Sequence, residues 1–202
     1  MPLPRGIQQV KQSLIHSTSW GGLRRQVHKH NGILLPHKPL IMKPPIFVYG
    51  TLCSPQVLQV LLGRTPALSP ARLQGHARYS VRHVLYPATI PTPHQPHQQV
   101  DGFLLQDLTR QEEKLLDWFE GDEYSRVLVQ VHCETKSTTM TSNTSTITSA
   151  QVYLWKDHLM DKLDLDRPWC LDTFQKQHVE TYLETTVRPC RLEMEQLGMT
   201  QE

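Results

Sequence analysis

The sequence IFVYGTLCSP, residues 46–55, joins a short apolar run to the beginning of a helix. Its first four residues are β-prone and are followed by Gly50, which is the pattern of a buried strand. Ser54 is a favourable N-cap, and Pro55 suits the first position of the helix that follows. We expect this helix to end at Gly63. Its apolar face is formed by Val57, Leu58, Leu61 and Leu62.

A second helix is predicted further along the chain, where Thr109 and Glu112 form the capping box T-x-x-E. Gly121 is expected to end it. Its buried stripe is formed by Leu115, Leu116 and Phe119. A final helix is predicted over residues 172–186. Its inward-facing residues are Phe174, Val179, Tyr182 and Leu183.

Short strands are predicted between these helices. The candidates are residues 72–74, 79–83, 88–90, 100–105, 127–131 and 151–155. Because the strands and helices do not alternate regularly, the sequence predicts a mixed α/β (α+β) domain. Its sheet is expected to be largely antiparallel and strongly curved.

The composition predicts where this domain begins and ends. Residues 1–45 are basic and interrupted by prolines, so we expect a flexible extension before a domain at residues 46–187. Residues 137–149, STTMTSNTSTITS, are a low-complexity Ser/Thr stretch and indicate a solvated insertion in a hairpin. Residues 188–202 are expected to form a C-terminal tail.

Charge is distributed unevenly along the 202 residues, although the formal net charge is only +2. Residues 1–100 contain 11 Lys or Arg and no acidic residue, whereas all 19 Asp and Glu lie in residues 101–202. Carboxylate chemistry must therefore come from the second half. The basic residues are dispersed, and Trp20 is the only aromatic residue of the extension, which argues against a nucleic-acid-binding protein.

The cysteine pattern and the hydropathy limit the cellular compartments in which the protein is expected. The four cysteines include no C-x-x-C pair, which is typical of a reduced intracellular protein and indicates no metal site. No stretch approaches about 18 consecutive apolar residues, so we expect no membrane association. We expect a cytoplasmic protein, with mitochondrial import as the alternative because the N-terminus lacks acids and contains arginines.

Two stretches carry candidate chemistry. The turn at residues 49–55, YGTLCSP, offers backbone N–H groups and a helix start, which suit an anion such as a carboxylate. Many α/β proteins have such a turn without a ligand, and the spacing alone favours that alternative. The acidic stretch at residues 117–126, DWFEGDEYSR, contains Glu120, which follows a core position. Its carboxylate can point into the domain, where partial burial would raise its pKa and suit it to proton transfer. Asp122 and Glu123 are expected to face water.

The sequence resembles a known family at these two stretches. FVYGTL at residues 47–52 and LDWFEGDEYSR at residues 116–126 are similar to the gamma-glutamylcyclotransferase-like superfamily, most of all its plant avirulence-induced-gene branch. YPATIP at residues 86–91 and VYLW at residues 152–155 agree with this. The resemblance covers about residues 46–186. It implies a small, curved, mixed β-barrel with flanking helices and a cavity at one end.

The resemblance also implies roles for individual residues. Glu120 would be the general acid/base. The substrate-binding residues would be Tyr49, Gly50, Thr51, Leu52, Cys53 and Ser54. Tyr124 would either add a hydroxyl to the pocket or be structural, and Arg126 would either pair with nearby acids or be structural. No His lies near Cys53 in the sequence, so we expect Cys53 to be a wall residue rather than a nucleophile.

The expected function is intramolecular aminolysis of a small-molecule gamma-glutamyl amide, which releases 5-oxoproline and an amine. This reaction requires no metal or organic cofactor. The glutathione-specific branch usually has an aromatic residue after its Y-G-S-L turn, whereas Cys53 and Ser54 follow here, so glutathione is not assigned as the substrate. The leaving amine and the oligomeric state stay open. The alternative is a non-catalytic domain that binds a gamma-glutamyl or amino-acid-like ligand.

Overall fold

The computed structural model describes residues 43–135 and 144–200, and all of these except Lys43 belong to a unit that spans Pro44–Glu202. The predicted basic extension, apart from its last three residues, lies outside the described residues, as does most of the predicted Ser/Thr insertion. Residues 144–149 of that insertion are described. They form part of a strand, so this end of the insertion belongs to the sheet.

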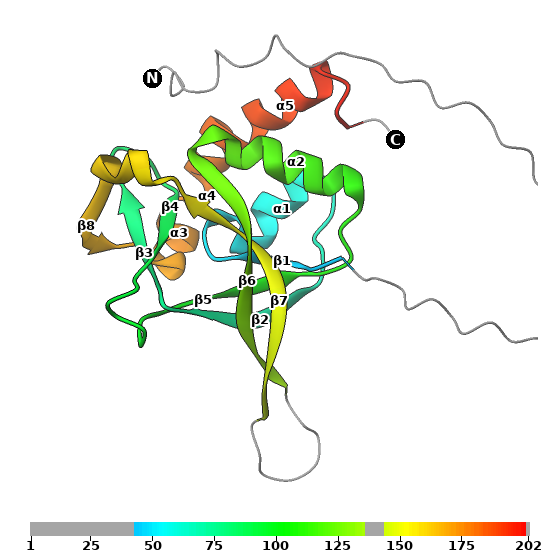
Figure 1. The fold of residues 1–202 in the computed structure, drawn as a ribbon. Helices are drawn as coiled ribbons and strands as arrows, with labels where there is room; N and C mark the ends of the chain where they lie inside the picture. Colours follow the sequence, from blue (N-terminus) through cyan, green and yellow to red (C-terminus); the bar gives the residue numbers. More distant parts are fainter. Residues whose placement is uncertain (1–42, 136–143, 201–202) are drawn as a thin grey trace, which may run out of the picture. The chain divides into compact units, whose positions relative to one another are not determined.

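Five strands close into a barrel in the order β1-β5-β2-β6-β7 (Figure 1). Their bounds are β1 (Ile46–Val48), β2 (Leu68–Gln74), β5 (Gln99–Leu105), β6 (Tyr124–Thr135) and β7 (Thr144–Trp155). β1 pairs antiparallel with β5 and parallel with β7, so Phe47 lies between Leu104 and Val152. The predicted mixed α+β class, with a curved mixed barrel and flanking helices, is confirmed.

The barrel is tightly closed where β1 and β5 meet. A Cβ atom built on Gly102 would lie 2.2 Å from the carbonyl oxygen of Val48 and 2.7 Å from a ring carbon of Phe47. Only glycine allows the two backbones to approach this closely. β1 is buried along its whole length, as its apolar sequence predicted.

A second sheet contains three antiparallel strands in the order β4-β3-β8. These are β3 (His76–Val81), β4 (Pro87–Pro91) and β8 (Leu163–Pro168). β8 was not predicted, because LDLDRP is mostly polar and contains a single buried residue, Leu163. The pairing partner of this short polar strand, rather than its own pattern, determines its conformation.

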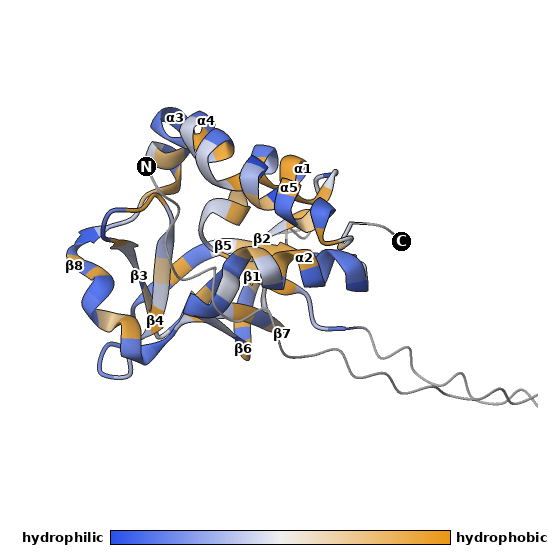
Figure 2. Cartoon of the chain, turned by 90° about the horizontal axis from the view of Figure 1, so that it is seen from above, coloured by the Kyte–Doolittle hydropathy of each residue, from blue (hydrophilic) through white to orange (hydrophobic). Residues whose placement is uncertain are grey.

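The helices are α1 (Pro55–Leu62), α2 (Arg110–Glu120), α3 (Leu171–Gln177), α4 (Val179–Tyr182) and α5 (Arg188–Gln196). Apolar and hydrophilic residues alternate around them (Figure 2). The capping box predicted for α2 is present, with both Thr109–Glu112 hydrogen bonds formed. Ser54 occupies the N-cap position of α1, but its side chain makes no capping bond, contrary to expectation, and donates instead to Gln56 at 3.4 Å.

The chain does not end in a tail after residue 187, as the sequence had suggested. Leu183–Val187 forms a π-helical turn that leads directly into α5. Met194 of α5 is completely buried, and Arg191 donates to the carbonyl of Leu61 at 2.8 Å. α5 therefore packs against the core of the domain through Met194.

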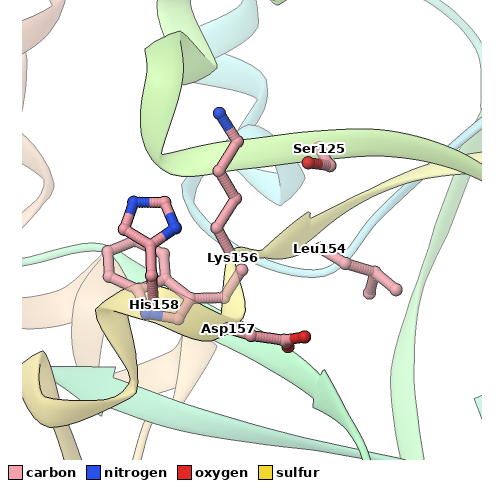
Figure 3. Close-up of a pocket in the computed structure, with 6 residues that line it drawn as sticks. Ser125, Leu154, Lys156, Asp157 and His158 are labelled. Atoms are coloured by element: carbon pink, nitrogen blue, oxygen red, sulfur yellow. The ribbon is translucent and has the colours of Figure 1, made fainter.

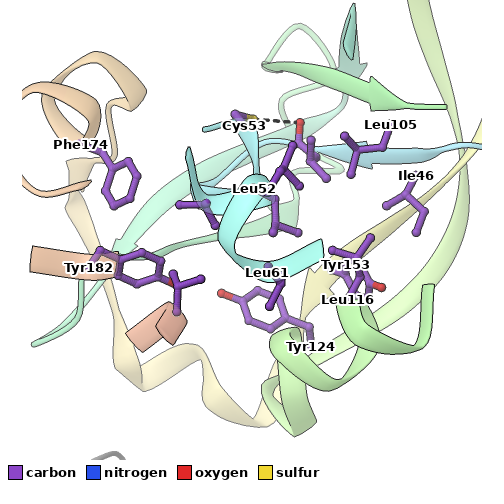
Figure 4. Packing of buried hydrophobic residues seen from close by; sticks show 14 of the residues in the cluster. Ile46, Leu52, Cys53, Leu61, Leu105, Leu116, Tyr124, Tyr153, Phe174 and Tyr182 are labelled. Atoms are coloured by element: carbon purple, nitrogen blue, oxygen red, sulfur yellow. Dashed lines mark hydrogen bonds between the residues drawn. The ribbon is translucent and has the colours of Figure 1, made fainter. Parts of the chain in front are cut away.

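The main core lies between the barrel and the helices, and Figure 4 shows Leu52, Leu61, Tyr124 and Tyr182 packed within it. A smaller cluster around Phe47 and Val152 fills the barrel. None of the helices in the described ranges has the length and apolar character needed to cross a bilayer.

Candidate active site

The turn after β1 is held by short backbone bonds. The N–H of Cys53 donates to the carbonyl of Gly50 at 3.0 Å, and Thr51–Cys53 forms one 3-10 turn. As at any helix start, the first N–H groups have no partner within the turn. Within the described ranges, no acceptor is bonded to the N–H groups of Thr51 and Leu52. The turn therefore presents free donors.

Glycine is needed at position 50 because a proline lies against it. A Cβ atom on Gly50 would come within 2.8 Å of the Pro87 side chain. The carbonyl of Pro87 in turn accepts the hydroxyl of Tyr124 at 2.8 Å. The segment YPATIP thus connects the turn to the strand that follows α2.

Glu120 is the last residue of α2, and Gly121 turns the chain away with a φ of +66°. Glu120 as a whole residue is partly exposed, but its carboxyl group is enclosed by protein atoms. Burial, with a smaller contribution from the nearby Asp117 carboxylate, raises the Glu120 pKa to about 8. None of the described residues makes a hydrogen bond or ion pair with this carboxylate. Glu120 is therefore a buried acid whose pKa lies close to neutral.

Asp117 is held one turn before Glu120 by two partners. Arg126 approaches its carboxylate at 3.2 Å, and the hydroxyl of Tyr153 donates to it at 2.7 Å. Arg126 also lies 3.8 Å from Glu113, so it pairs with acids, which was one of its two expected roles. Arg126 pairs with Asp117 rather than with Glu120, and no cationic side chain among the described residues pairs with Glu120.

Five tyrosines lie close enough to Glu120 for its charge to raise the pKa of each hydroxyl. They are Tyr49, Tyr86, Tyr124, Tyr153 and Tyr182. Burial is the largest cause of every one of these shifts, so the hydroxyls stay protonated. Glu120 therefore lies among neutral hydroxyl groups.

Four of these hydroxyls donate to protein acceptors. Tyr49 donates to the Tyr153 carbonyl at 2.6 Å, and Tyr124 and Tyr153 donate as described above. Tyr86 donates to the Glu123 carboxylate at 2.9 Å. Tyr182 differs because it accepts from Thr51 Oγ1 at 3.4 Å, and no acceptor for its own hydrogen is found in the part of the chain that the structure describes.

The predicted turn and the predicted acid approach each other through these tyrosines. The hydroxyls of Tyr49 and Tyr182 both lie within range of the Glu120 charge, and Tyr182 accepts a hydrogen bond from Thr51 in the turn. The Tyr124 hydroxyl is committed to Pro87, so Tyr124 can offer a ligand only an acceptor.

The family described as gamma-glutamyl cyclotransferase, AIG2-like matches residues 46–171, which include the turn, the Glu120 helix and both sheets. The chain belongs to this family. It is 32% identical over 139 residues to AIG2-like protein B of Arabidopsis thaliana, a match that covers 69% of this chain and 73% of that protein. AIG2-like protein C from the same plant is 33% identical over 141 residues, covering 70% and 74%.

A solved structure agrees with this assignment. The solution structure of another Arabidopsis thaliana protein superimposes with a TM-score of 0.50 at 25% identity, covering 77% of this chain and 86% of that one. The superfamily predicted from the short motifs is thus confirmed. The mixed barrel with flanking helices is thus the fold of this family.

The other residues of the turn that were predicted to bind substrate have buried side chains. Leu52, Cys53 and Ser54 are almost fully enclosed. Cys53 donates to the Val48 carbonyl at 3.3 Å (dashed in Figure 4), and burial raises the pKa of its thiol to about 12. A thiol with this pKa is a poor nucleophile.

Glu123 was expected to face water. Its carboxylate instead accepts hydrogen bonds from Tyr86 and Lys162. The positions of Tyr86, Tyr153 and Asp117 near Glu120 were not predicted from the sequence. YPATIP and VYLW, the motifs that contain the two tyrosines, were the available signals. Nothing in the local sequence marked Tyr182 as more than a core residue.

Two surface cavities lie elsewhere on the AIG2-like domain. One, of about 450 Å³, is lined by Ser125, Leu154, Trp155, Lys156, Asp157 and His158 (Figure 3). The other, of about 340 Å³, lies beside Arg78. Neither is lined by Glu120 or by residues of the turn. In residues 43–135 and 144–200, no three His, Cys, Asp or Glu side chains are grouped as a metal would require.

Proposed function

We propose that this protein is a gamma-glutamylcyclotransferase-type enzyme and that Glu120 is its general acid/base. The observation that carries the proposal is the Glu120 carboxyl group, which is enclosed, has no protein partner among the described residues and has a pKa of about 8. A structural carboxylate would normally be paired or solvated. A proton-transfer group works best with a pKa near the operating pH.

The reaction needs only a folded substrate and a proton shuttle. Glu120 removes a proton from the α-ammonium of the gamma-glutamyl group, and the amine nitrogen then attacks the side-chain amide carbonyl carbon. A new C–N bond closes the five-membered lactam and the original amide C–N bond breaks. Glu120 returns this proton to the leaving nitrogen, and the ring nitrogen loses its second proton to the released amine, which departs as an ammonium ion. Because the attack is intramolecular, correct positioning supplies much of the rate and no covalent nucleophile is involved.

The turn supplies the complementary groups in this proposal. The free N–H groups of Thr51 and Leu52 would bind the substrate α-carboxylate or the oxyanion that develops on the amide carbonyl. The available hydrogen of the Tyr182 hydroxyl would add one donor. The neutral tyrosines around Glu120 would exclude water and keep the carboxylate basic.

The test is turnover of a panel of gamma-glutamyl amides, with 5-oxoproline measured by mass spectrometry. We expect the wild-type protein to release 5-oxoproline from at least one compound. Glu120→Gln should lower kcat about 100- to 10,000-fold, because the amide keeps the side-chain size but cannot accept the proton. Wild-type kcat/KM should rise with pH through about 8, as Glu120 ionises.

Asp122→Asn is the matched control, since Asp122 is exposed and lies just two residues after Glu120. It should retain wild-type activity. Glu123→Gln is expected to cost less than Glu120→Gln, although it weakens the Tyr86 and Lys162 contacts. Normal turnover by Glu120→Gln would contradict the assignment. Ligand binding without turnover by the wild-type protein would instead support a non-catalytic binding domain.

A further inference from the structure

The cavity beside Arg78 is separate from the Glu120 site. It has a volume of about 340 Å³ and lies between the outer face of strands β2 and β5 and the first residue of α3. Its lining includes Pro70, Arg72, Arg78, Asp101, Phe103 and Leu171. Arg78 does not contribute to the Glu120 pKa. A ligand here would therefore not occupy the proposed catalytic position.

Arg78 is held rigidly but is only partly used. Its Nη1 atom donates to the carbonyl of Tyr49 at 2.5 Å and makes a longer contact, 3.4 Å, with the carbonyl of Asp101. Its guanidinium lies 5.2 Å from the centre of the Trp169 ring. Its Nε and Nη2 atoms make no hydrogen bond within the described ranges. Within the described part of the chain, two nitrogen atoms of this half-buried guanidinium are therefore available to bond a ligand in the cavity.

The net charge of the side chains around the cavity favours a ligand with a single negative charge. Asp101 accepts a hydrogen bond from Arg72 Nε at 3.1 Å, so these two charges largely balance. Burial lowers the pKa of Arg78, but a guanidinium stays protonated in proteins. The net charge offered to a ligand is therefore about +1. A monoanion matches it, whereas a phosphate dianion would carry one charge too many and would face Asp101.

The shape of the cavity further restricts the class of ligand that it can bind. A guanidinium is a planar fork that matches the two oxygens of a carboxylate. Phe103, Leu171 and Pro70 give the cavity apolar walls, and its volume is at the small end of the range for ligand pockets. We propose that this cavity binds a small monocarboxylate, with the carboxylate on Arg78 and an apolar body against Phe103 and Leu171.

The Arg78 side chain connects this cavity to the turn after β1. The same guanidinium that would bind the carboxylate donates to the Tyr49 carbonyl, immediately before Gly50. An occupant of the cavity therefore shares its main polar partner with the turn. We expect ligand binding to be visible at Gly50 as well as at the cavity walls.

The test is an NMR titration of the full chain with sodium benzoate at constant ionic strength. The signals followed are the Arg78 side-chain N–H and the backbone amides of Gly50, Gly102 and Leu171. Benzamide serves as the neutral isostere and inorganic phosphate as the competing anion. We expect saturable shifts with benzoate at all four groups, and at least about tenfold weaker binding of benzamide, because a hydrogen bond to a charged group is lost.

Two variants test the site from opposite walls. Arg78→Lys keeps the charge but loses the planar fork, and should weaken benzoate binding about tenfold or more. Leu171→Phe fills the cavity and leaves Arg78 in place, so it should also weaken binding even if Arg78→Lys is unstable. Arg82→Lys is the matched control. Arg82 is also an arginine that donates to a backbone carbonyl, that of Asp161, but it does not line the cavity.

Several results would overturn the proposal. These are the absence of saturable shifts, equal binding of benzoate and benzamide, or tighter binding of phosphate. Shifts confined to Thr51 and Glu120 would place the ligand at the proposed catalytic site instead. Unchanged benzoate affinity in Leu171→Phe would show that the ligand lies outside the cavity.

Discussion

Glu120 is placed where its charge is unfavourable. Its carboxyl group is enclosed, the Asp117 carboxylate is nearby, and the C-terminus of α2 contributes negative partial charge. Arg126 and Tyr153 bond to Asp117 and not to Glu120. Each of these effects favours the protonated acid, and burial, followed by the Asp117 charge, raises the Glu120 pKa to about 8. Because the ionised Glu120 carboxylate has no such partner among the residues that the structure describes, its ionisation lowers the free energy of unfolding.

This placement predicts a pH dependence of stability. With a folded pKa of about 8 against about 4.3 in the unfolded chain, Glu120 contributes stability below about pH 4.3, and this is lost as the pH rises toward 8. Between pH 5 and 9, Glu120→Gln should therefore gain free energy of unfolding relative to wild type. The gain should be on the order of 2–4 kcal/mol. Urea unfolding at both pH values measures it.

Asp122→Asn is the control for this measurement, because Asp122 is exposed and its variant should follow the wild-type pH dependence. If Glu120→Gln and wild type change stability in parallel from pH 5 to 9, the Glu120 pKa is not raised.

At the scale of single elements, the N-terminus of α2 is held by several side-chain hydrogen bonds. Its capping box joins Thr109 and Glu112 in both directions, at 3.1 and 2.8 Å. Glu112 also receives two hydrogen bonds from Arg64, at 2.6 and 2.8 Å, and Arg64 donates to the Asp107 carbonyl. The N-terminus of the helix is therefore fixed to the end of α1, which positions Glu120 at the other end.

Loss of the cap should destabilise the fold without altering the site. Thr109→Ala should lower the free energy of unfolding by about 1 kcal/mol. Thr109→Ser keeps the hydroxyl and should cost clearly less. Urea unfolding compares the two variants, and NMR titration of Glu120 in each should give the wild-type pKa. Equal stability of Thr109→Ala and wild type would mean that the cap does not contribute.

At the scale of the whole molecule, the C-terminal helix closes the core. α5 follows the π-helical turn after Tyr182 and packs against α1, with Met194 completely buried. Two residues earlier, Leu192 is 57% exposed. The two residues are similar in size and share one helix, but just one of them contributes to the core.

The difference between them predicts unequal effects of truncation. Met194→Ala should lower the free energy of unfolding by about 2–5 kcal/mol, because it leaves a cavity in the core. Leu192→Ala should change it by about 0.5 kcal/mol or less. Thermal or urea unfolding of the two variants gives the comparison. Equal losses for the two variants would contradict the difference in burial, and no loss for Met194→Ala would show that α5 is not part of the cooperative fold.

The sequence by itself determined the local features of this protein. The buried strand before Gly50, the helix between Pro55 and Leu62, and the capping box of α2 follow from short patterns, since each depends on neighbours within a few residues. Glu120 was found for the same reason, because its position between a core residue and a helix-ending glycine is visible locally. The family was recognised from the same two motifs.

The tertiary structure alone decided which residues surround Glu120 and which segments complete the core. Thr51 and Tyr182 are 131 positions apart, and Arg78 reaches the Tyr49 carbonyl across 29. β8 and α5 have too little apolar periodicity to reveal their partners, and Leu163 and Met194 are buried only because distant elements cover them. A local pattern fixes the conformation of a segment, but a pKa, a cavity or a buried contact depends on what packs against it.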